Sequence, residues 1–221
     1  MKSIWFSKQT VVNKLTKALN DNPDCTIDVI LSNPDLVSSV RNEVPELITY
    51  LEKDNYKNLK ELFDLALSDR ANNETMDFRF NRNAANVLSF SARAIQKFIQ
   101  GSPVFIESLT QFMNDANFYR NPIYAGHFQR IIHSYLFATS GNIMNTIPNL
   151  SEFLLKNIDI LSYKTLLAAF ISDFSNFVTE TSLISKIAEE AGVGKTSNLF
   201  AVTLMSDVLQ STTEHNLFYT N

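Results

Sequence analysis

The chain has 221 residues, 45% of them hydrophobic, which is enough apolar material for one continuous core rather than a disordered tail. Its 5 glycines and 6 prolines supply few tight turns, so the composition disfavours an all-β fold and favours helices. The net charge of -4 disfavours nucleic acid as the main partner, because that binding needs a surface rich in Lys and Arg. We expect one all-α domain over residues 1–221.

The only cysteine, Cys25, excludes an internal disulfide and any zinc site built from several cysteines. A single thiol is typical of a reducing compartment, and the first residues lack the apolar core of a signal peptide. No stretch approaches the ~18 apolar residues of a membrane-spanning helix. We therefore expect a protein of the cytoplasm, and also of the nucleus, with no membrane span.

Two large aromatic residues, Trp5 and Phe6, stand next to each other at the start of the chain. Residues this close to a terminus are normally poorly ordered, so a tryptophan there needs an explanation. Two interpretations stay open: the pair folds back as a cap on the first helix, which we prefer, or it binds a partner.

Apolar residues with helical spacing follow in three runs, Val11–Leu19, Leu47–Leu51 and Leu59–Ala66. Between the first two runs, the segment Thr26–Leu31 is rich in β-branched residues. It has no second strand to pair with, because no other segment shows this pattern. We expect a short helix there.

Five prolines each stand immediately before a run of helical spacing. Proline is favoured in the first turn of a helix, where its missing N–H group would have had no partner. A short polar side chain before the proline can accept a hydrogen bond from an exposed N–H group. The sequence therefore predicts helix N-caps at Asn33, Ser102 and Asn121.

Two helices are expected in the middle of the chain, at about Phe80–Gln100 and Pro122–Ala138, and further helices near 149–155, 161–171, 174–190 and 197–211. Many helices joined by short polar loops suit either a globular bundle or a stacked α-solenoid. We favour an irregular armadillo/HEAT-like α-solenoid, because long helices alternate with short ones. No repeat of fixed period is visible in the sequence.

Four basic residues, Arg79, Arg82, Arg93 and Lys97, fall within one arc of the expected helix over Phe80–Gln100. This arc lies opposite the apolar stripe of that helix. The preferred interpretation is an ordinary solvated face. The alternative is that Arg82, Arg93 and Lys97 form a strip that docks an acidic partner.

The segment Ala191–Thr196 resembles the end of a phosphate-binding P-loop. The first glycine of that motif is missing, because Glu189 stands in its place, and a helix rather than a strand is expected before it. A carboxylate at this position would repel phosphate. We interpret the segment as the glycine-capped end of one helix, followed by Thr196 or Ser197 as the cap of the next.

The histidines do not form a metal site, because His127 and His133 lie on different sides of one helix and His215 lies in the tail. We expect a rim or solvent position for the first two. No base or positive cluster stands next to Cys25 to activate it, and no paired carboxylates stand in an apolar context. We therefore expect no enzyme activity, no cofactor, no metal and no small-molecule substrate.

The order of short motifs along the chain resembles the N-terminal region of the SAPS-domain family, the regulatory and scaffold subunits of protein phosphatase 6. The resemblance extends over about residues 4–212, in the order and with the spacing of that family. The matching elements are Trp5-Phe6, Thr26–Leu31, Asn33–Val37, Val44–Leu51, Asn58–Leu62, Ala85–Ser89, Asn121–Phe128, Phe153–Lys156 and Ser197-Asn198. The helix Ser162–Ala169 departs from the family pattern, because it lacks the glycine and aspartate found there.

This resemblance implies a non-catalytic scaffold that binds a Ser/Thr protein phosphatase catalytic subunit of the phosphatase-6 type and targets it to substrates. It also implies partner contacts at Asn121, Tyr124 and His127, since these belong to the matching Asn-Pro motif. Family members are longer than 221 residues, so we expect a fragment or a short homologue. The alternative is a generic armadillo-like adaptor that binds peptide segments in trafficking or cytoskeletal assembly.

Overall fold

The computed structural model describes residues 13–68, 78–174, 183–192 and 199–206. Every regular element in these ranges is a helix, which confirms the all-α prediction. Residues 199–206 are helical. The other helices are α1 (Lys14–Asp21), α2 (Ile27–Leu31), α3 (Leu36–Arg41), α4 (Pro45–Leu67), α5 (Phe78–Leu88), α6 (Arg93–Gly101), α7 (Pro103–Asn114), α8 (Ala116–Tyr119), α9 (Pro122–Ala138), α10 (Ile143–Thr146), α11 (Leu150–Lys156), α12 (Leu161–Asp173) and α14 (Leu183–Gly192).

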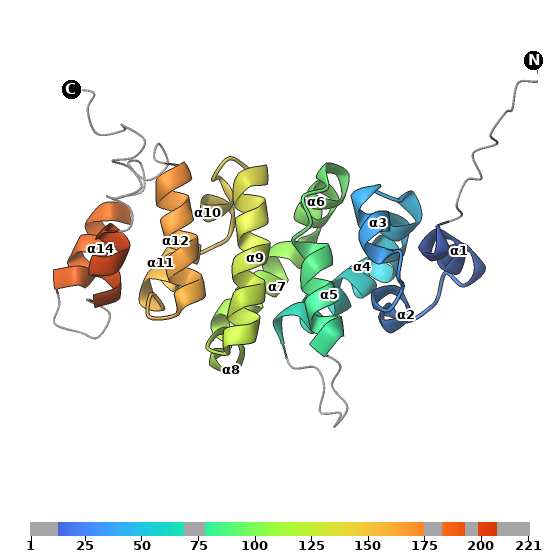
Figure 1. The fold of residues 1–221 in the computed structure, drawn as a ribbon, viewed down its shortest axis with the longest axis horizontal. Coiled ribbons are helices and arrows are strands. Elements are labelled where there is room, and N and C mark those ends of the chain that lie inside the picture. The colour runs from blue at the N-terminus through green and yellow to red at the C-terminus, as the bar shows by residue number, and fades with distance from the viewer. Residues whose placement is uncertain (1–12, 69–77, 175–182, 193–198, 207–221) are drawn as a thin grey trace, which may run out of the picture.

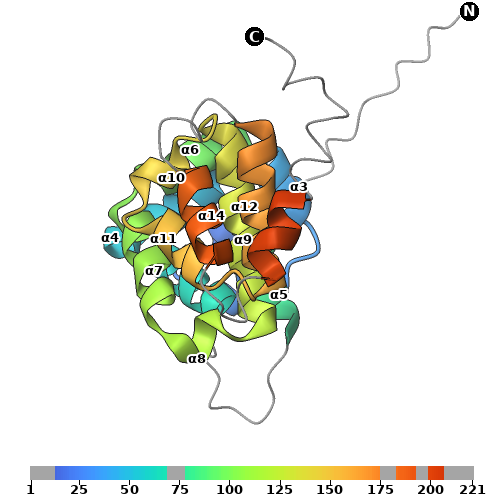
Figure 2. The ribbon, with the colours of Figure 1, turned by 90° about the vertical axis from the view of Figure 1, so that its left-hand side faces the viewer.

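The helices follow one another in chain order along the longest axis of the molecule, from α1 at one end to α14 at the other (Figure 1). Seen along this axis, α4, α7 and α11 lie on one side, and α5, α9 and α12 lie on the other (Figure 2). Contacts join neighbours on the same side, as between α5 and α9 or α9 and α12. Contacts also join the two sides, as between α4 and α5.

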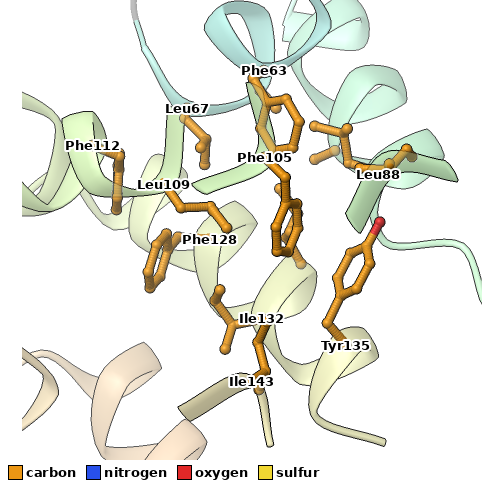
Figure 3. Close-up of a cluster of buried hydrophobic side chains, with 14 of the residues drawn as sticks. Phe63, Leu67, Leu88, Phe105, Leu109, Phe112, Phe128, Ile132, Tyr135 and Ile143 are labelled. Atoms are coloured by element: carbon orange, nitrogen blue, oxygen red, sulfur yellow. The ribbon is translucent and has the colours of Figure 1, made fainter. Parts of the chain in front are cut away.

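Large aromatic side chains fill the space between the two sides (Figure 3). Phe105 of α7 lies between Phe63 of α4 and Tyr135 of α9, with ring centroids 6.2 and 4.7 Å away. Phe112 of α7 stacks on Phe128 of α9 at 4.8 Å. All five rings are buried. Interlocked rings of this size hold the three helices α4, α7 and α9 together at one seam.

The three N-caps predicted before prolines are confirmed only in part. Asn121 caps α9 as predicted, because its Oδ1 accepts a hydrogen bond from Ile123 N at 2.9 Å. Ser102 occupies the N-cap position of α7, but its hydroxyl donates to Ile99 O instead of accepting from the helix. The prediction for Asn33 is wrong: Asp35 precedes α3, and Asn33 Oδ1 accepts from Asp35 N within a turn.

The two apolar runs predicted at Leu47–Leu51 and Leu59–Ala66 both belong to α4. The backbone between them leaves helical geometry at Lys53–Tyr56, so α4 consists of two helical stretches joined by a bend. Asn58 Nδ2 spans the bend and donates to Tyr50 O at 2.8 Å. The predicted short helix at Thr26–Leu31 is present as α2.

The predicted long helix over Phe80–Gln100 is wrong, because the structure has two helices there, α5 and α6. Ser89 ends the first, since its hydroxyl donates to Ala85 O at 2.7 Å. Ala92 offers no side-chain cap to the second helix. Instead, Glu43 Oε1 accepts a hydrogen bond from Ala94 N at 2.7 Å. A carboxylate from the connection between α3 and α4 therefore caps α6.

Candidate protein-binding surface

A groove with a volume of about 340 Å³ lies between the α2–α3 region and α5, and we call it the α3–α5 groove. None of the described residues that line it is a carboxylate, and Arg79 is its one charged residue. The α2–α3 wall consists of Leu31, Ser32, Asn33, Pro34, Leu36, Val37 and Val40. The α5 wall consists of Arg79, Phe80, Asn83, Asn86, Val87 and Phe90.

Hydrogen bonding fixes the two walls relative to each other. Asn83 Nδ2 donates to Leu31 O at 2.9 Å, which ties the end of α2 to the middle of α5. On the other face of α5, Ala84 and Leu88 are fully buried in the core. Val37 on the opposite wall is 51% exposed. It therefore presents an apolar side chain to solvent at a groove whose walls are held in place.

Two arginines lie next to this groove, on the side of α5 that faces α9, and we call them the arginine pair. Arg130 of α9 donates from Nη1 to Oδ1 of Asn86 at 2.6 Å, and Asn86 is part of the groove wall. Arg82 stands one helical turn before Asn86 and is exposed. Burial and the nearby charge of Arg82 lower the pKa of Arg130, as expected for two guanidinium groups in proximity.

No described carboxylate forms an ion pair with either member of the arginine pair. Asn86 supplies a neutral oxygen to Arg130, which satisfies one donor but leaves the positive charge in place. Two cations held together without a counter-charge repel each other, so an added anion would be stabilised at this position.

The structure separates the basic residues that the sequence placed on one face. Arg82 belongs to α5, whereas Arg93 and Lys97 belong to α6. All three are exposed, as predicted. The continuous docking strip on a single helix is therefore wrong, because the chain leaves helical geometry between Ser89 and Ala92.

Two of the residues carried over from the Asn-Pro motif, Tyr124 and His127, are buried, at 5% and 9% exposed, and the third, Asn121, caps α9. The predicted rim or solvent position of His127 is wrong, because its Nδ1 lies 2.8 Å from Ala66 O. A carbonyl only accepts, so Nδ1 carries the proton. Burial lowers the pKa of His127, and its neutral side chain serves to join α9 to α4.

Trp5 and Phe6 lie outside the described residues, as do Val193–Thr196 of the P-loop-like segment. The residues that the sequence analysis missed are Asn83, Asn86 and Arg130. Each is an ordinary polar residue on an amphipathic helix. Its role depends on a contact with a residue far away in the chain, and no local pattern signals such a contact.

The described residues show little that resembles catalytic chemistry. Burial raises the pKa of the Cys25 thiol, which keeps it protonated and weakly nucleophilic. No group of three His, Cys, Asp or Glu side chains within the described ranges is placed to hold a metal ion. Among the described helices, none combines the length and apolar character needed to cross a bilayer.

A second pocket, between α1 and α4, has a volume of about 620 Å³ and includes Glu46 and Glu52 in its lining. Its one basic lining residue, Lys53, already pairs with Asp24. This pocket therefore offers no free positive charge and differs in electrostatic character from the α3–α5 groove.

Comparison with known proteins gives no relative: no family model, curated protein or solved structure matches the chain. The resemblance to the SAPS-domain family therefore rests on the order of the sequence motifs alone. The helical fold and the α3–α5 groove are observations that stand without that resemblance.

Proposed function

We propose that this chain is a non-catalytic scaffold whose helices stack as an irregular armadillo/HEAT-like solenoid and bind a protein partner. The chain-order layout of the helices supports the solenoid, because each helix contacts mainly its neighbours along the axis (Figure 1). A stack of this kind offers a long surface that suits a protein ligand. Its cytoplasmic or nuclear location is part of the same proposal.

One observation carries the binding function: an open apolar groove lies beside two arginines that have no described counter-charge. Exposed apolar surface and the mutual repulsion of two neighbouring guanidinium groups both cost free energy in the isolated chain. A protein partner that covers the groove and supplies carboxylates removes both costs. A solvated surface with no partner would gain nothing from this arrangement.

The class of partner follows from the sequence resemblance, which points to a Ser/Thr protein phosphatase catalytic subunit of the phosphatase-6 type. In this proposal the metals and the hydrolytic chemistry belong to the partner. The chain holds the catalytic subunit and places it on substrates, without a cofactor or small-molecule substrate of its own. Trp5, Phe6, Arg93 and Lys97 stay candidate contacts in this complex.

The test is retention of a purified phosphatase-6-type catalytic subunit on the immobilised full-length chain. We expect saturable retention at micromolar concentration, because specific interfaces of standard size commonly bind at that level or more tightly. A catalytic subunit of an unrelated metallophosphatase is the control. No retention at micromolar concentration would reject the phosphatase as the partner.

A second candidate is an adaptor that binds peptide segments of trafficking or cytoskeletal proteins. The size of the α3–α5 groove favours it, because about 340 Å³ accommodates a few side chains. Mass spectrometry of proteins that co-purify with the tagged chain separates the two functions. Repeated recovery of unrelated proteins with a common short motif, and no phosphatase, would favour the adaptor.

A further inference from the structure

We infer that the α3–α5 groove and the arginine pair together bind a short segment of the partner in which large apolar side chains adjoin carboxylates. This inference deepens the proposed function and rests on it for the existence of a partner. It adds the place of contact and the chemistry that the partner must present there.

The apolar part of the inference comes from the walls of the groove. Leu36, Val40 and Val87 are buried beneath it, whereas Val37 is half exposed at its rim. A leucine or phenylalanine side chain placed against Val37 would leave water and bury Val37 with it. A volume of about 340 Å³ is near the lower end of the ~300–1,000 Å³ of binding pockets. The groove therefore fits side chains of a segment.

The acidic part of the inference comes from charge. Arg79 lines the groove, and the arginine pair stands beyond Asn86 at its edge. Arg130 uses one of its five N–H donors on Asn86, so donors remain on both guanidinium groups of the pair. A carboxylate accepts two parallel hydrogen bonds from a guanidinium group, and that geometry is among the strongest polar contacts in proteins.

The position of α5 explains why one segment can satisfy both parts. This helix lies between α3 and α9 in the row of helices, and it contacts α2 on one side and α9 on the other (Figure 1). Asn83 holds the groove side of the helix, and Asn86 joins the groove to Arg130. An extended segment that crosses α5 therefore meets an apolar wall first and a cationic edge next.

A fluorescein-labelled peptide in which a run of leucines adjoins a run of glutamates is the probe, and its binding to the full chain is measured by fluorescence anisotropy. We expect Arg82→Ala to weaken binding about tenfold, the scale of losing one charge-assisted hydrogen bond. Val37→Asp should abolish binding, because it places a carboxylate against the apolar segment. Arg120→Ala is the matched control, because Arg120 is exposed, does not line the groove and pairs with Asp159 instead, so this variant should bind the probe with unchanged affinity.

Two control peptides separate the two parts of the inference. Replacing glutamate by glutamine keeps the shape and removes the charge, and replacing leucine by serine keeps the charge and removes the apolar anchors. Each should bind at least about tenfold more weakly than the probe. Circular dichroism of each variant confirms that the fold is retained. A phosphoserine version that binds much more tightly than the glutamate probe would overturn the assignment of carboxylates.

Equal binding of the glutamate and glutamine peptides, or no effect of Arg82→Ala, would also overturn the inference. These results are independent of the phosphatase test. Binding of the probe without retention of the catalytic subunit would reject only the partner class. Retention of the catalytic subunit by the wild type, Arg82→Ala and Val37→Asp alike would reject the groove and leave the scaffold function in place.

Discussion

Replacing Tyr135 by phenylalanine should stabilise the protein, which is an unusual outcome for a change in a buried core. Tyr135 is fully buried, and its hydroxyl has no hydrogen-bond partner among the described residues. It points toward α5 and the side chain of Leu88 (Figure 3). Burial raises the pKa of the Tyr135 hydroxyl far above its ordinary value, in agreement with an apolar surrounding.

The magnitude follows from the cost of an unsatisfied polar group, which is about 1–3 kcal/mol for a buried donor or acceptor. Removing the oxygen leaves a small void, and its cost of roughly 0.4 kcal/mol for about 15 Å³ offsets part of the gain. We therefore expect Tyr135→Phe to raise the free energy of unfolding by about 0.5–2.5 kcal/mol. That corresponds to a rise in Tm of about 1–10 °C for a chain of this size.

Tyr163→Phe is the matched control, because it makes the same chemical change at a hydroxyl that is hydrogen-bonded. Tyr163 is fully buried, and its hydroxyl donates to Tyr119 O at 2.6 Å. Losing that bond should lower the free energy of unfolding by about 1–3 kcal/mol. Urea unfolding monitored by circular dichroism measures both variants. If Tyr135→Phe destabilises the protein as much as Tyr163→Phe, the hydroxyl of Tyr135 has a partner and the reasoning is wrong.

Three further predictions test other parts of the structure. His127 has a lowered pKa in the folded state, so the unfolded chain binds the proton more readily, and stability should fall as the pH drops below about 6.5. His127→Asn keeps a donor toward Ala66 O and should remove this part of the pH dependence in urea titrations; an unchanged slope would assign it to other groups. Asn121→Ala should cost about 1 kcal/mol through loss of the α9 cap, and a change below about 0.3 kcal/mol in the same assay would show that the cap is dispensable. Solution scattering should give a radius of gyration above the roughly 17 Å of a compact chain of 221 residues, and a value of about 17 Å would indicate a single-core bundle.

The sequence predicted those helices whose boundaries are set by local residues. The range of α9 is the predicted one, because Pro122 begins it, Asn121 caps it and its apolar residues repeat with helical spacing. The helix α2 was also predicted, since a β-branched run without a strand partner has no sheet to join. Local signals of this kind act between residues that are close in the chain, so they can be recognised from the amino-acid sequence alone.

The features that the sequence did not predict depend on contacts between distant residues. The start of α6 is capped by Glu43, and the N–H of Lys14 at the start of α1 donates to Asp35. Glu43 lies between α3 and α4, and Asp35 is the residue immediately before α3, so both carboxylates are distant in sequence from the helix starts that they cap. The break between α5 and α6, at residues 89–92, contains no proline or glycine. The sequence therefore has no local signal that a helix ends there.

The candidate site was predicted only in part, for the same reason. Exposure of Arg82, Arg93 and Lys97 followed from the helical period, because each lies opposite buried apolar residues. Which basic residues lie together could not be predicted from the helical period. Arg82 lies near Arg130 of α9, which donates to Asn86, and not with the basic residues of α6. The burial of His127 was missed because the carbonyl of Ala66, which accepts a hydrogen bond from His127 Nδ1, belongs to α4 and lies far away in the chain.

Hydrogen exchange of the full chain, with and without a saturating phosphatase-6-type catalytic subunit, tests the central claim that this scaffold binds its partner through the α3–α5 groove. Binding should slow amide exchange over residues 31–40 and 78–90, the two walls of the groove, and leave the far end around α14 unchanged. Protection confined to other helices, or no protection anywhere at saturating concentration of the catalytic subunit, would contradict the claim.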